Sequence, residues 1–420
     1  MNTPIVAPVS ATEENLPPLP RINVQAFCET PQAAPVLQAV AADRRMSRAH
    51  MDVYSGGIPA AIQYYSQTTT PQLLVVESSK PREGLLADLA GLAQVCSAET
   101  RVIVLGHVND ISLYRELLAQ GLSDYLAAPF SPQQILASFS ALFGNGEAAK
   151  LGKVVSFMGA KGGVGSSFLA HNVAWLLSSE YKADTVIADL DLAFGTAGLD
   201  FNLDPAQGIL EALSSADRID PIFIDRLLTK CSDRLLLLAS PSSVHDSVNI
   251  EEETLEIIID VLRTSTPFTI LDLPSTWDKW MKSVLIQSDK LVIVATPELA
   301  SLRNTKSLAD TIKGLRPNDE PPILILNQVQ MGKRPEIPAA EFARAAGLEI
   351  SLSIPFDAQT FGQAATNGQM IPQIAPKSQA AEILEQAAAL IFNGEIKSTE
   401  KKGSSFLKPL LDKLGKKEKK

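Results

Sequence analysis

A glycine-rich segment in the middle of the chain lies between a strand pattern and a helix pattern, and this arrangement limits the folds that the chain can adopt. Residues 154–158 (Val-Val-Ser-Phe-Met) form a short apolar run typical of a buried strand. Residues 159–167 follow with four glycines, and a helical pattern begins after them. Glycines let backbone N–H groups turn around phosphate oxygens, and a helix N-terminus adds partial positive charge. The segment predicts a phosphate-binding loop. The alternative is a tight turn that binds no ligand.

Short apolar runs alternate with helical patterns on both sides of this loop. Such alternation predicts an α/β fold with mainly parallel sheets covered by helices on both faces. In a first domain, residues 21–144, strands are expected at 73–76, 102–105 and 124–126, with helices at 111–119 and 132–142. In a second domain, residues 153–394, strands are expected at 153–158, 185–188, 235–239, 268–271, 291–295 and 323–326, with a closing helix near 379–392.

Three further segments have loop or tail composition. Residues 1–20 are rich in Pro, Thr, Ala and Glu and predict a disordered leader. Residues 145–152 are small and polar, and predict an interdomain linker. Residues 395–420 form a basic tail.

Composition and charge limit the classes of function. The chain of 420 residues has a net charge of −10, which argues against a general nucleic-acid binder, so DNA is not expected as a partner. Its three cysteines, Cys28, Cys96 and Cys231, are too far apart in sequence for a metal or CxxC motif, and we expect reduced, buried thiols. The N-terminus lacks a signal-peptide pattern, and no run approaches the roughly 18 apolar residues of a spanning helix. We therefore expect the protein in the cytoplasm or on its membrane face.

The loop itself, Lys161-Gly162-Gly163-Val164-Gly165-Ser166-Ser167, resembles the deviant Walker A motif of the ParA/MinD superfamily, whose usual form is Lys-Gly-Gly-x-Gly-Lys-Thr. The resemblance implies ATP and Mg²⁺ as cofactors, with these seven residues around the phosphates. It also implies that Lys161 reaches the partner's phosphates in a nucleotide-sandwich homodimer, and that Ser167 binds Mg²⁺.

The second lysine of the motif is replaced by Ser166. A serine supplies no positive charge to the transferring phosphoryl group, and charge stabilisation provides most of the catalysis in this chemistry. Nucleotide binding through backbone amides, Mg²⁺ and Lys161 is still expected, whereas hydrolysis is expected to be weak or absent.

Three later segments match other motifs of the same superfamily. Asp191 ends an Asp-x-Asp motif, and the resemblance implies that it positions the attacking water; the alternative is an acid that only caps a strand. Asp272 follows an apolar run, as in a Walker B strand, and could reach Mg²⁺ through water. Asn327 ends the run at 323–326 and is the candidate for adenine recognition, although Asn is also common in turns.

The first domain resembles a response-regulator receiver that has lost its phosphorylation residues. The phospho-accepting Asp of that family falls at Glu77, its Thr or Ser at or next to Gly106, and its Lys at Ala128. The acidic pair expected after the first strand is also missing. We predict a degenerate receiver-like, flavodoxin-like domain used for protein contact or localisation. An unrelated flavodoxin-like domain would have much the same role.

The combination of both halves, from about residue 21 to 394, resembles the CpaE/TadZ family of Flp (tad) pilus-assembly proteins. That resemblance implies pilus and secretion assembly proteins as partners and a position at a cell pole. Two other functions remain open: an active ATPase for DNA partitioning or division-site placement, and a scaffold that binds no nucleotide.

The basic tail has one apolar face. Residues 401–420 contain eight lysines and two acidic residues, and five apolar residues recur at helical spacing: Phe406, Leu407, Leu410, Leu411 and Leu414. This pattern predicts an interfacial helix over 404–420 and a peripheral membrane location. It also resembles the membrane-targeting tail of MinD-type proteins. The alternatives are a solvated tail and a helix that docks on a partner.

Overall fold

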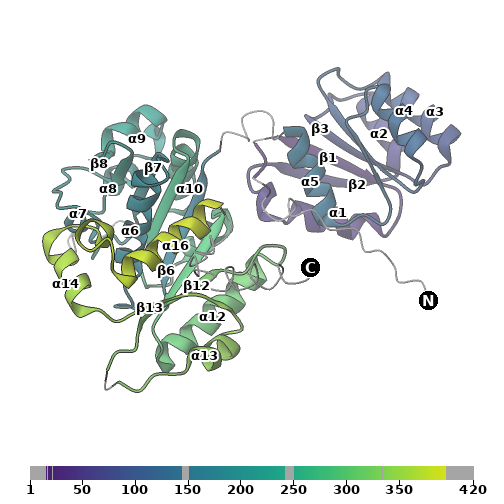
Figure 1. Ribbon diagram of the computed structural model, residues 1–420. Helices are drawn as coiled ribbons and strands as arrows, with labels where there is room; N and C mark the ends of the chain where they lie inside the picture. The colour runs from purple at the N-terminus through teal and green to yellow at the C-terminus, as the bar shows by residue number, and fades with distance from the viewer. Residues whose placement is uncertain are drawn as a thin grey trace, which may run out of the picture.

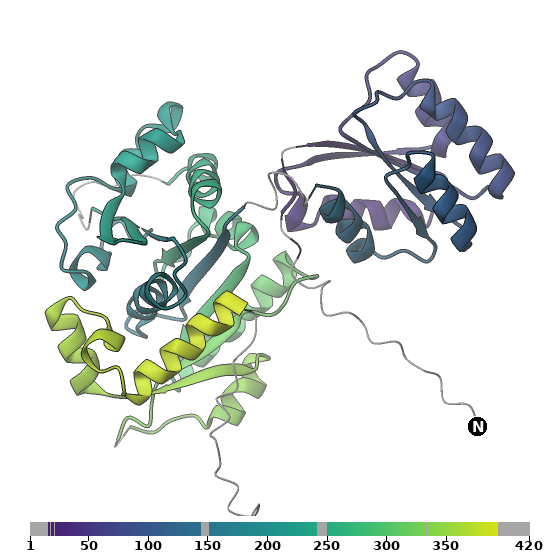
Figure 2. The same ribbon diagram turned by 45° about the horizontal axis from the view of Figure 1, so that its top comes forward.

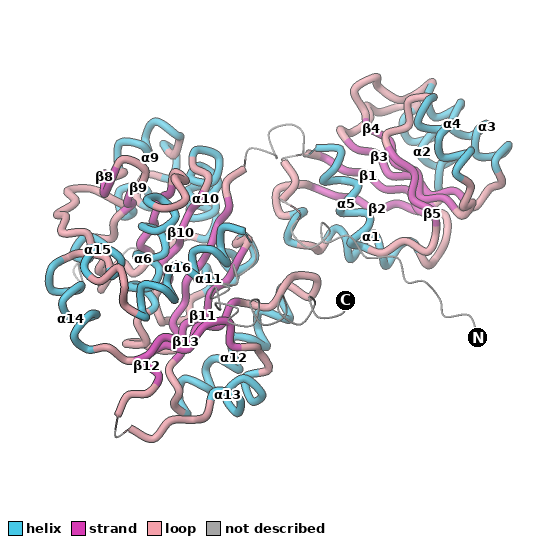
Figure 3. Tube along the Cα trace, viewed as in Figure 1, coloured by secondary structure: helices cyan, strands magenta, loops and turns pink. Residues whose placement is uncertain are grey.

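The computed structural model describes residues 16, 18–20, 22–143, 151–241, 250–332 and 334–393. These residues form two α/β domains, each around its own sheet, so the predicted fold class is confirmed (Figures 1 and 3). Most of the predicted leader (1–20), most of the linker (145–152) and the whole tail (395–420) lie outside the described residues. Within the ranges described, no helix is both long and apolar enough to span a membrane.

The smaller domain contains a five-stranded parallel sheet in the order β2-β1-β3-β4-β5, which is the flavodoxin-like order. Its strands are β1 (Asn23–Cys28), β2 (His50–Ser55), β3 (Leu73–Ser78), β4 (Arg101–Gly106) and β5 (Asp124–Ala127). One face is covered by α1 (Ala33–Ala41) and α5 (Pro132–Phe143). The other is covered by α2 (Gly57–Tyr65), α3 (Arg82–Ala93) and α4 (Ile111–Ala119).

The predicted strands of this domain are confirmed as β3, β4 and β5, whereas β1 and β2 were not predicted. The run in β3 is apolar and fully buried, as expected for a strand covered on both faces. Edge strand β2 is only partly buried and mixes polar residues into its sequence, so it carries no continuous apolar signal. Leu19, assigned above to the leader, is buried in the core of this domain, and its N–H donates to the carbonyl of Arg45 (2.9 Å).

The larger domain contains an eight-stranded sheet in the order β13-β12-β11-β6-β10-β7-β9-β8. All neighbours are parallel except β8, which runs antiparallel to β9 at one edge. The strands are β6 (Lys153–Gly159), β7 (Thr185–Asp189), β8 (Thr229–Ser232), β9 (Leu235–Leu238), β10 (Phe268–Leu273), β11 (Lys290–Ala295), β12 (Ile323–Val329) and β13 (Ile350–Pro355). The six strands predicted here are confirmed, and β8 and β13 are additional.

Two helical layers bury the two faces of this sheet. One apolar core lies under α6 (Ser166–Ser179), α7 (Ala197–Asp200), α14 (Ala358–Asn367), α15 (Ile371–Ile374) and α16 (Gln379–Asn393). Figure 2 shows α16, in yellow, lying along the sheet. The opposite core lies under α8 (Ile209–Leu213), α9 (Pro221–Leu227), α10 (Glu252–Ser265), α11 (Lys279–Gln287), α12 (Leu299–Leu315) and α13 (Ala339–Ala346).

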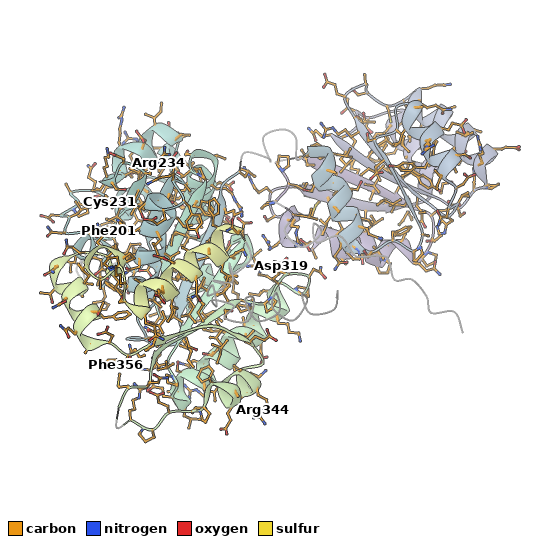
Figure 4. All side chains as sticks on the ribbon, in the orientation of Figure 1. Phe201, Cys231, Arg234, Asp319, Arg344 and Phe356 are labelled. Atoms are coloured by element: carbon orange, nitrogen blue, oxygen red, sulfur yellow. The ribbon has the colours of Figure 1, made fainter. Side chains whose placement is uncertain are left out.

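The two domains touch through charged side chains. Arg44 and Arg45, in the short 3₁₀ helix η1 (Arg44–Met46), both pair with Asp319, and Arg45 Nη2 lies 2.9 Å from Asp319 Oδ1. Arg44 Nη1 also lies 3.5 Å from Oδ1 of Asp289. Asp289 directly precedes β11 and Asp319 lies shortly before β12, so the contact is at the amino edge of the larger sheet. Figure 4 shows Asp319 on the side that faces the smaller domain.

Candidate functional site

The glycine-rich loop joins β6 to α6 near the centre of the larger sheet. β6 lies between β11 and β10, and α6 begins at Ser166, so the unpaired amides of its first turn lie at the end of the loop. Gly163 and Gly165 have φ values of +79° and +87°, in the left-handed region that side chains rarely adopt. A Cβ on Gly165 would lie 2.7 Å from Nδ2 of Asn327. The tight loop geometry therefore requires these two glycines.

A cavity of about 610 Å³ opens at the carboxyl edge of the sheet, beside this loop. Most residues predicted for the site line it: Lys161, Gly163, Val164, Gly165, Ser166, Ser167, Asp191 and Asn327. Gly162 is exposed in the same loop. Asp272 is buried below the cavity, next to the lining residues Leu273 and Pro274. Ligands of open α/β sheets commonly bind at this edge.

Two buried polar groups at the phosphate end lack a hydrogen-bond partner within the described ranges. They are the hydroxyl of Ser166 and both carboxylate oxygens of Asp272. Buried polar atoms are normally hydrogen-bonded, and exceptions occur at sites for waters, ions or ligands. The oxygens of Asp272 lie near His171 but accept no hydrogen bond from the described residues, and they suit a hydrated Mg²⁺ ion, which prefers oxygen ligands and keeps several waters. The residues present therefore fit a phosphate with its metal.

Asp189, the first acid of the Asp-x-Asp motif, anchors the loop that follows β7. Its carboxylate accepts the N–H of Asp191 (3.1 Å) and of Ala197 (3.2 Å). Burial, together with the charge of Asp272 opposite it on β10, raises the pKa of Asp189 to about 7. The carboxylate of Asp191 is partly exposed at the cavity and accepts the N–H of Phe194 (3.0 Å). The two acids thus have different environments.

The side chain of Asn327 holds the glycine-rich loop in place. Its Nδ2 donates to the carbonyl of Val164 (2.8 Å), and its Oδ1 accepts the N–H of Gln328 (2.9 Å). Gln328 adds a second link from Nε2 to the carbonyl of Gly163 (3.0 Å). A role for Asn327 in base recognition stays a prediction, since the amide already has this structural function.

Lys161 lies at the cavity but pairs within its own chain. Its Nζ is 2.9 Å from Oε1 of Glu298, the residue just before α12, and Glu298 also pairs with Arg334. The hydrogen bond from Lys161 lowers the pKa of Glu298. Neither Glu298 nor Arg334 was predicted as a site residue, because both lie far from the loop in sequence.

His171 is the second feature that sequence reasoning missed. It lies on α6 and is fully buried, with Nδ1 2.7 Å from Asp200 and Nε2 3.4 Å from Asp272. Burial alone would lower the pKa of His171, but the hydrogen bond to Asp200 and the negative charges of Asp200 and Asp272 raise it to about 10. Its surrounding sequence, Phe-Leu-Ala-His-Asn-Val-Ala, predicts only an apolar helix.

The position of a receiver's phospho-acceptor is filled by a fully buried glutamate whose oxygens are occupied. Glu77 accepts the N–H groups of Glu29 (2.6 Å) and Thr30 (2.8 Å) and the hydroxyl of Thr30 (2.6 Å). His107 Nε2 lies 2.9 Å from Oε1 of Glu77, the oxygen that also accepts the Thr30 hydroxyl. Tyr125 Oη occupies the space beside Gly106, since a Cβ there would lie 2.0 Å from that atom. Glu77 therefore ties the loops after β1 and β4 to β3.

Comparison with known proteins finds relatives that each cover part of the chain. No family model matches the chain. The septum site-determining protein MinD of Bacillus subtilis is 26% identical over 189 residues, which are 43% of this chain; the chain spans just under two thirds (66%) of that relative. A ParA family ATPase from Chlorobium tepidum has a TM-score of 0.53 and 29% identity, covering 57% of this chain and 98% of that one. The pilus assembly protein CpaE of Caulobacter crescentus is 46% identical, covering 30% of this chain and 97% of that one, with a TM-score of 0.30.

The strand order of the larger domain, the glycine-rich loop at the carboxyl edge of its sheet and the similarity to MinD and ParA proteins all indicate the same fold. The larger domain has the ParA/MinD-like ATPase fold.

Proposed function

We propose that the chain is an ATP-binding localisation and assembly factor that dimerises with nucleotide and hydrolyses it weakly or not at all. The observation that carries the proposal is the cavity beside the glycine-rich loop, together with the buried oxygens of Asp272 and Ser166, which make no hydrogen bond to any described residue. That combination suits a phosphate and a metal better than a turn with no ligand.

Each predicted site residue has a role in this proposal. The backbone amides of residues 161–167 hold the phosphates, Ser167 and Asp272 hold Mg²⁺, and Asp191 orients water. When bound, Mg²⁺ neutralises phosphate charge. Ser166 contributes a hydroxyl where a lysine would contribute a charge, and slow turnover follows from that loss. Asn327, which lines the cavity, is the proposed contact for the base.

Exposed apolar side chains around the cavity support dimerisation through this face. Phe194, Leu199, Leu299 and Phe356 are exposed, and Leu199 and Phe356 line the cavity (Figure 4 labels Phe356). Exposed apolar clusters mark interaction sites. Lys161 lies among them and is free to exchange Glu298 for a partner's phosphates.

The wider role is proposed from the resemblance of the two-domain sequence to the Flp pilus proteins. Pilus and secretion assembly proteins are the proposed partners, and a cell pole is the proposed location. If the basic tail binds the membrane, a dimer carries it twice, and two weak anchors hold far better than one. The acidic net charge and Ser166 disfavour the second candidate, an active partitioning ATPase.

The test is a titration of the full chain with a fluorescent ATP analogue and Mg²⁺, with phosphate release and sedimentation measured in parallel. We expect saturable binding, little phosphate release, and a dimer only with nucleotide. Lys161→Ala should reduce dimerisation, while Lys313→Ala, an exposed lysine on α12, should behave as the wild type.

Each other outcome selects another function. Absence of binding at millimolar ATP would overturn the proposal in favour of a nucleotide-free scaffold. Brisk phosphate release would show that Ser166 leaves hydrolysis intact, and DNA binding would then support partitioning.

A further inference from the structure

A fully buried histidine connects two walls of the proposed nucleotide site. His171 Nδ1 lies 2.7 Å from Oδ2 of Asp200, which accepts a hydrogen bond, and Nε2 lies 3.4 Å from Oδ2 of Asp272. His171 comes five residues after Ser166 on α6. The ring therefore joins the helix behind the phosphate loop to two acids on separate elements.

The two acids belong to different parts of the site. Asp272 lies on β10, at the proposed metal position. Asp200 ends α7, and Asp200, Thr196 and Leu199 line the cavity. α7 is a single turn, too short to be stable without tertiary contacts. The position of α7 therefore depends on its contacts with the rest of the domain, and the buried hydrogen bond between His171 and Asp200 is one of them.

The two ends of this bridge differ in geometry. The contact with Asp200 is a short hydrogen bond. The contact with Asp272 is longer and is not a hydrogen bond, because Nε2 of His171 and both oxygens of Asp272 lack such partners in the described part of the chain. A small rotation of the Asp272 carboxylate would make or break the contact with His171, whereas Asp200 would stay attached. A change at Asp272 can therefore alter the position of the His171 ring, and the hydrogen bond to Asp200 passes that change to α7.

We infer that His171 is a positioning residue that couples Asp272 to α7, so that occupation of the phosphate end orders the α7 wall of the cavity. The inference rests on the proposed function, because the occupant is a Mg²⁺–nucleotide. It gives that site a route to the dimer face: Leu199, on α7, is exposed there, and Phe194 lies just before α7.

The test is hydrogen exchange of the full chain with and without the Mg²⁺ complex of adenylyl imidodiphosphate, read on peptides that cover residues 191–202. In the wild type, the nucleotide should slow exchange in these peptides. His171→Asn keeps a donor near the Nδ1 position, which faces Asp200, and removes the group that faces Asp272. His171→Gln keeps a donor near the Nε2 position, which faces Asp272, and removes the group that faces Asp200. Coupling free energies are typically worth about fivefold or more, so we expect the nucleotide-dependent protection to fall at least about fivefold in both variants.

Nucleotide affinity separates positioning from simple packing. We expect the nucleotide affinity of both variants to fall by no more than the coupling that is lost, about fivefold, because coupling between two sites is reciprocal. His50→Asn, an exposed histidine of the smaller domain, is the matched control and should leave protection unchanged. Wild-type protection in His171→Asn and His171→Gln would overturn the inference and leave His171 as a core residue.

A second variant decides the case if the His171 variants do not fold. Asp200→Asn preserves the shape of the other partner; loss of protection there supports coupling, and wild-type protection overturns it. Failure of the proposed function gives a different result, namely no binding of the nucleotide to the wild-type chain. Binding without any change in exchange at residues 191–202 overturns the coupling alone.

Discussion

At the scale of single residues, the smaller domain has a glutamate, Glu77, at the position where a receiver domain has its phospho-accepting aspartate, and this glutamate has a structural role. A carboxylate that receives phosphate needs free oxygens, a metal site and a nearby lysine. Glu77 instead accepts three hydrogen bonds from Glu29 and Thr30 and contacts His107. The position has become a structural link between strand β3 and two loops, which agrees with a domain used for contact and not for phosphoryl transfer.

Glu77→Gln should therefore destabilise the smaller domain. The amide keeps the shape but turns an acceptor into a donor that faces other donors, and we expect a loss of about 2 kcal/mol in the free energy of unfolding. Chemical denaturation followed by far-UV circular dichroism would measure it, because all three tryptophans, Trp175, Trp277 and Trp280, lie in the larger domain. Glu99→Gln, an exposed position, is the control.

The effect should depend on pH. Burial would raise the pKa of Glu77, but hydrogen bonds from Thr30, His107 and Glu29 hold it below the ordinary value of 4.5. A carboxyl with a lowered folded pKa stabilises the protein above its unfolded pKa and loses that contribution as the pH falls through the folded pKa. The difference between wild type and Glu77→Gln should be constant above about pH 5 and shrink below pH 4.5. A constant difference down to pH 3 would contradict this account.

At the scale of elements, the loop between β6 and α6 depends on backbone conformations that only glycine adopts easily. Gly165 combines a positive φ with close approach of the Asn327 amide. The link from Asn327 to the carbonyl of Val164 then fixes the loop against β12. The shape of the phosphate site is thus shared between two elements 163 residues apart.

Gly165→Ala should weaken nucleotide binding without unfolding the domain. Left-handed backbone costs an alanine about 1–2 kcal/mol, and displacing Asn327 moves the loop further. We expect about tenfold weaker binding of the fluorescent ATP analogue, since 1.4 kcal/mol is a factor of ten. Gly314→Ala, in α12 with open space around it, should bind like the wild type. Equal affinity in both variants would show that the loop tolerates a side chain.

The elements also show what sequence could and could not predict. Runs such as Leu73–Val76 and Leu291–Ala295 were assigned correctly because both faces of a central parallel strand are covered, which leaves a continuous apolar pattern. Edge strands β2 and β8 lack that pattern, and β13 is only partly buried. The glycine loop was predicted because its geometry is local. The contacts of His171 with Asp200 and of Lys161 with Glu298 join separate elements, and no spacing rule reveals them.

At the scale of the whole molecule, a buried charge network joins the two domains. Asp289 and Asp319 each have an arginine of their own domain, Arg263 and Arg316, and each also receives Arg44 from the smaller domain. The larger domain therefore remains charge-paired without the contact.

Replacing Arg44, Arg45 and Arg48 together by alanine should release the domains from each other while both stay folded, because all three arginines pair with acids of the larger domain. We expect a larger radius of gyration in small-angle X-ray scattering than for the wild type, whose buried pairs should resist added salt. Arg82→Ala, which removes an exposed pair within the smaller domain, is the control. Identical scattering from the triple variant and the wild type would mean that these charges do not hold the domains together.

The position of this contact between the domains also determines where the two smaller domains would lie in a dimer. The smaller domain is attached at the amino edge of the larger sheet, and the cavity opens at the carboxyl edge. If two copies met through the faces that carry the cavity, the dimer would be elongated, with one flavodoxin-like domain at each end. The two smaller domains of such a dimer would point away from each other. One dimer would then be able to contact two neighbouring partner molecules at the same time.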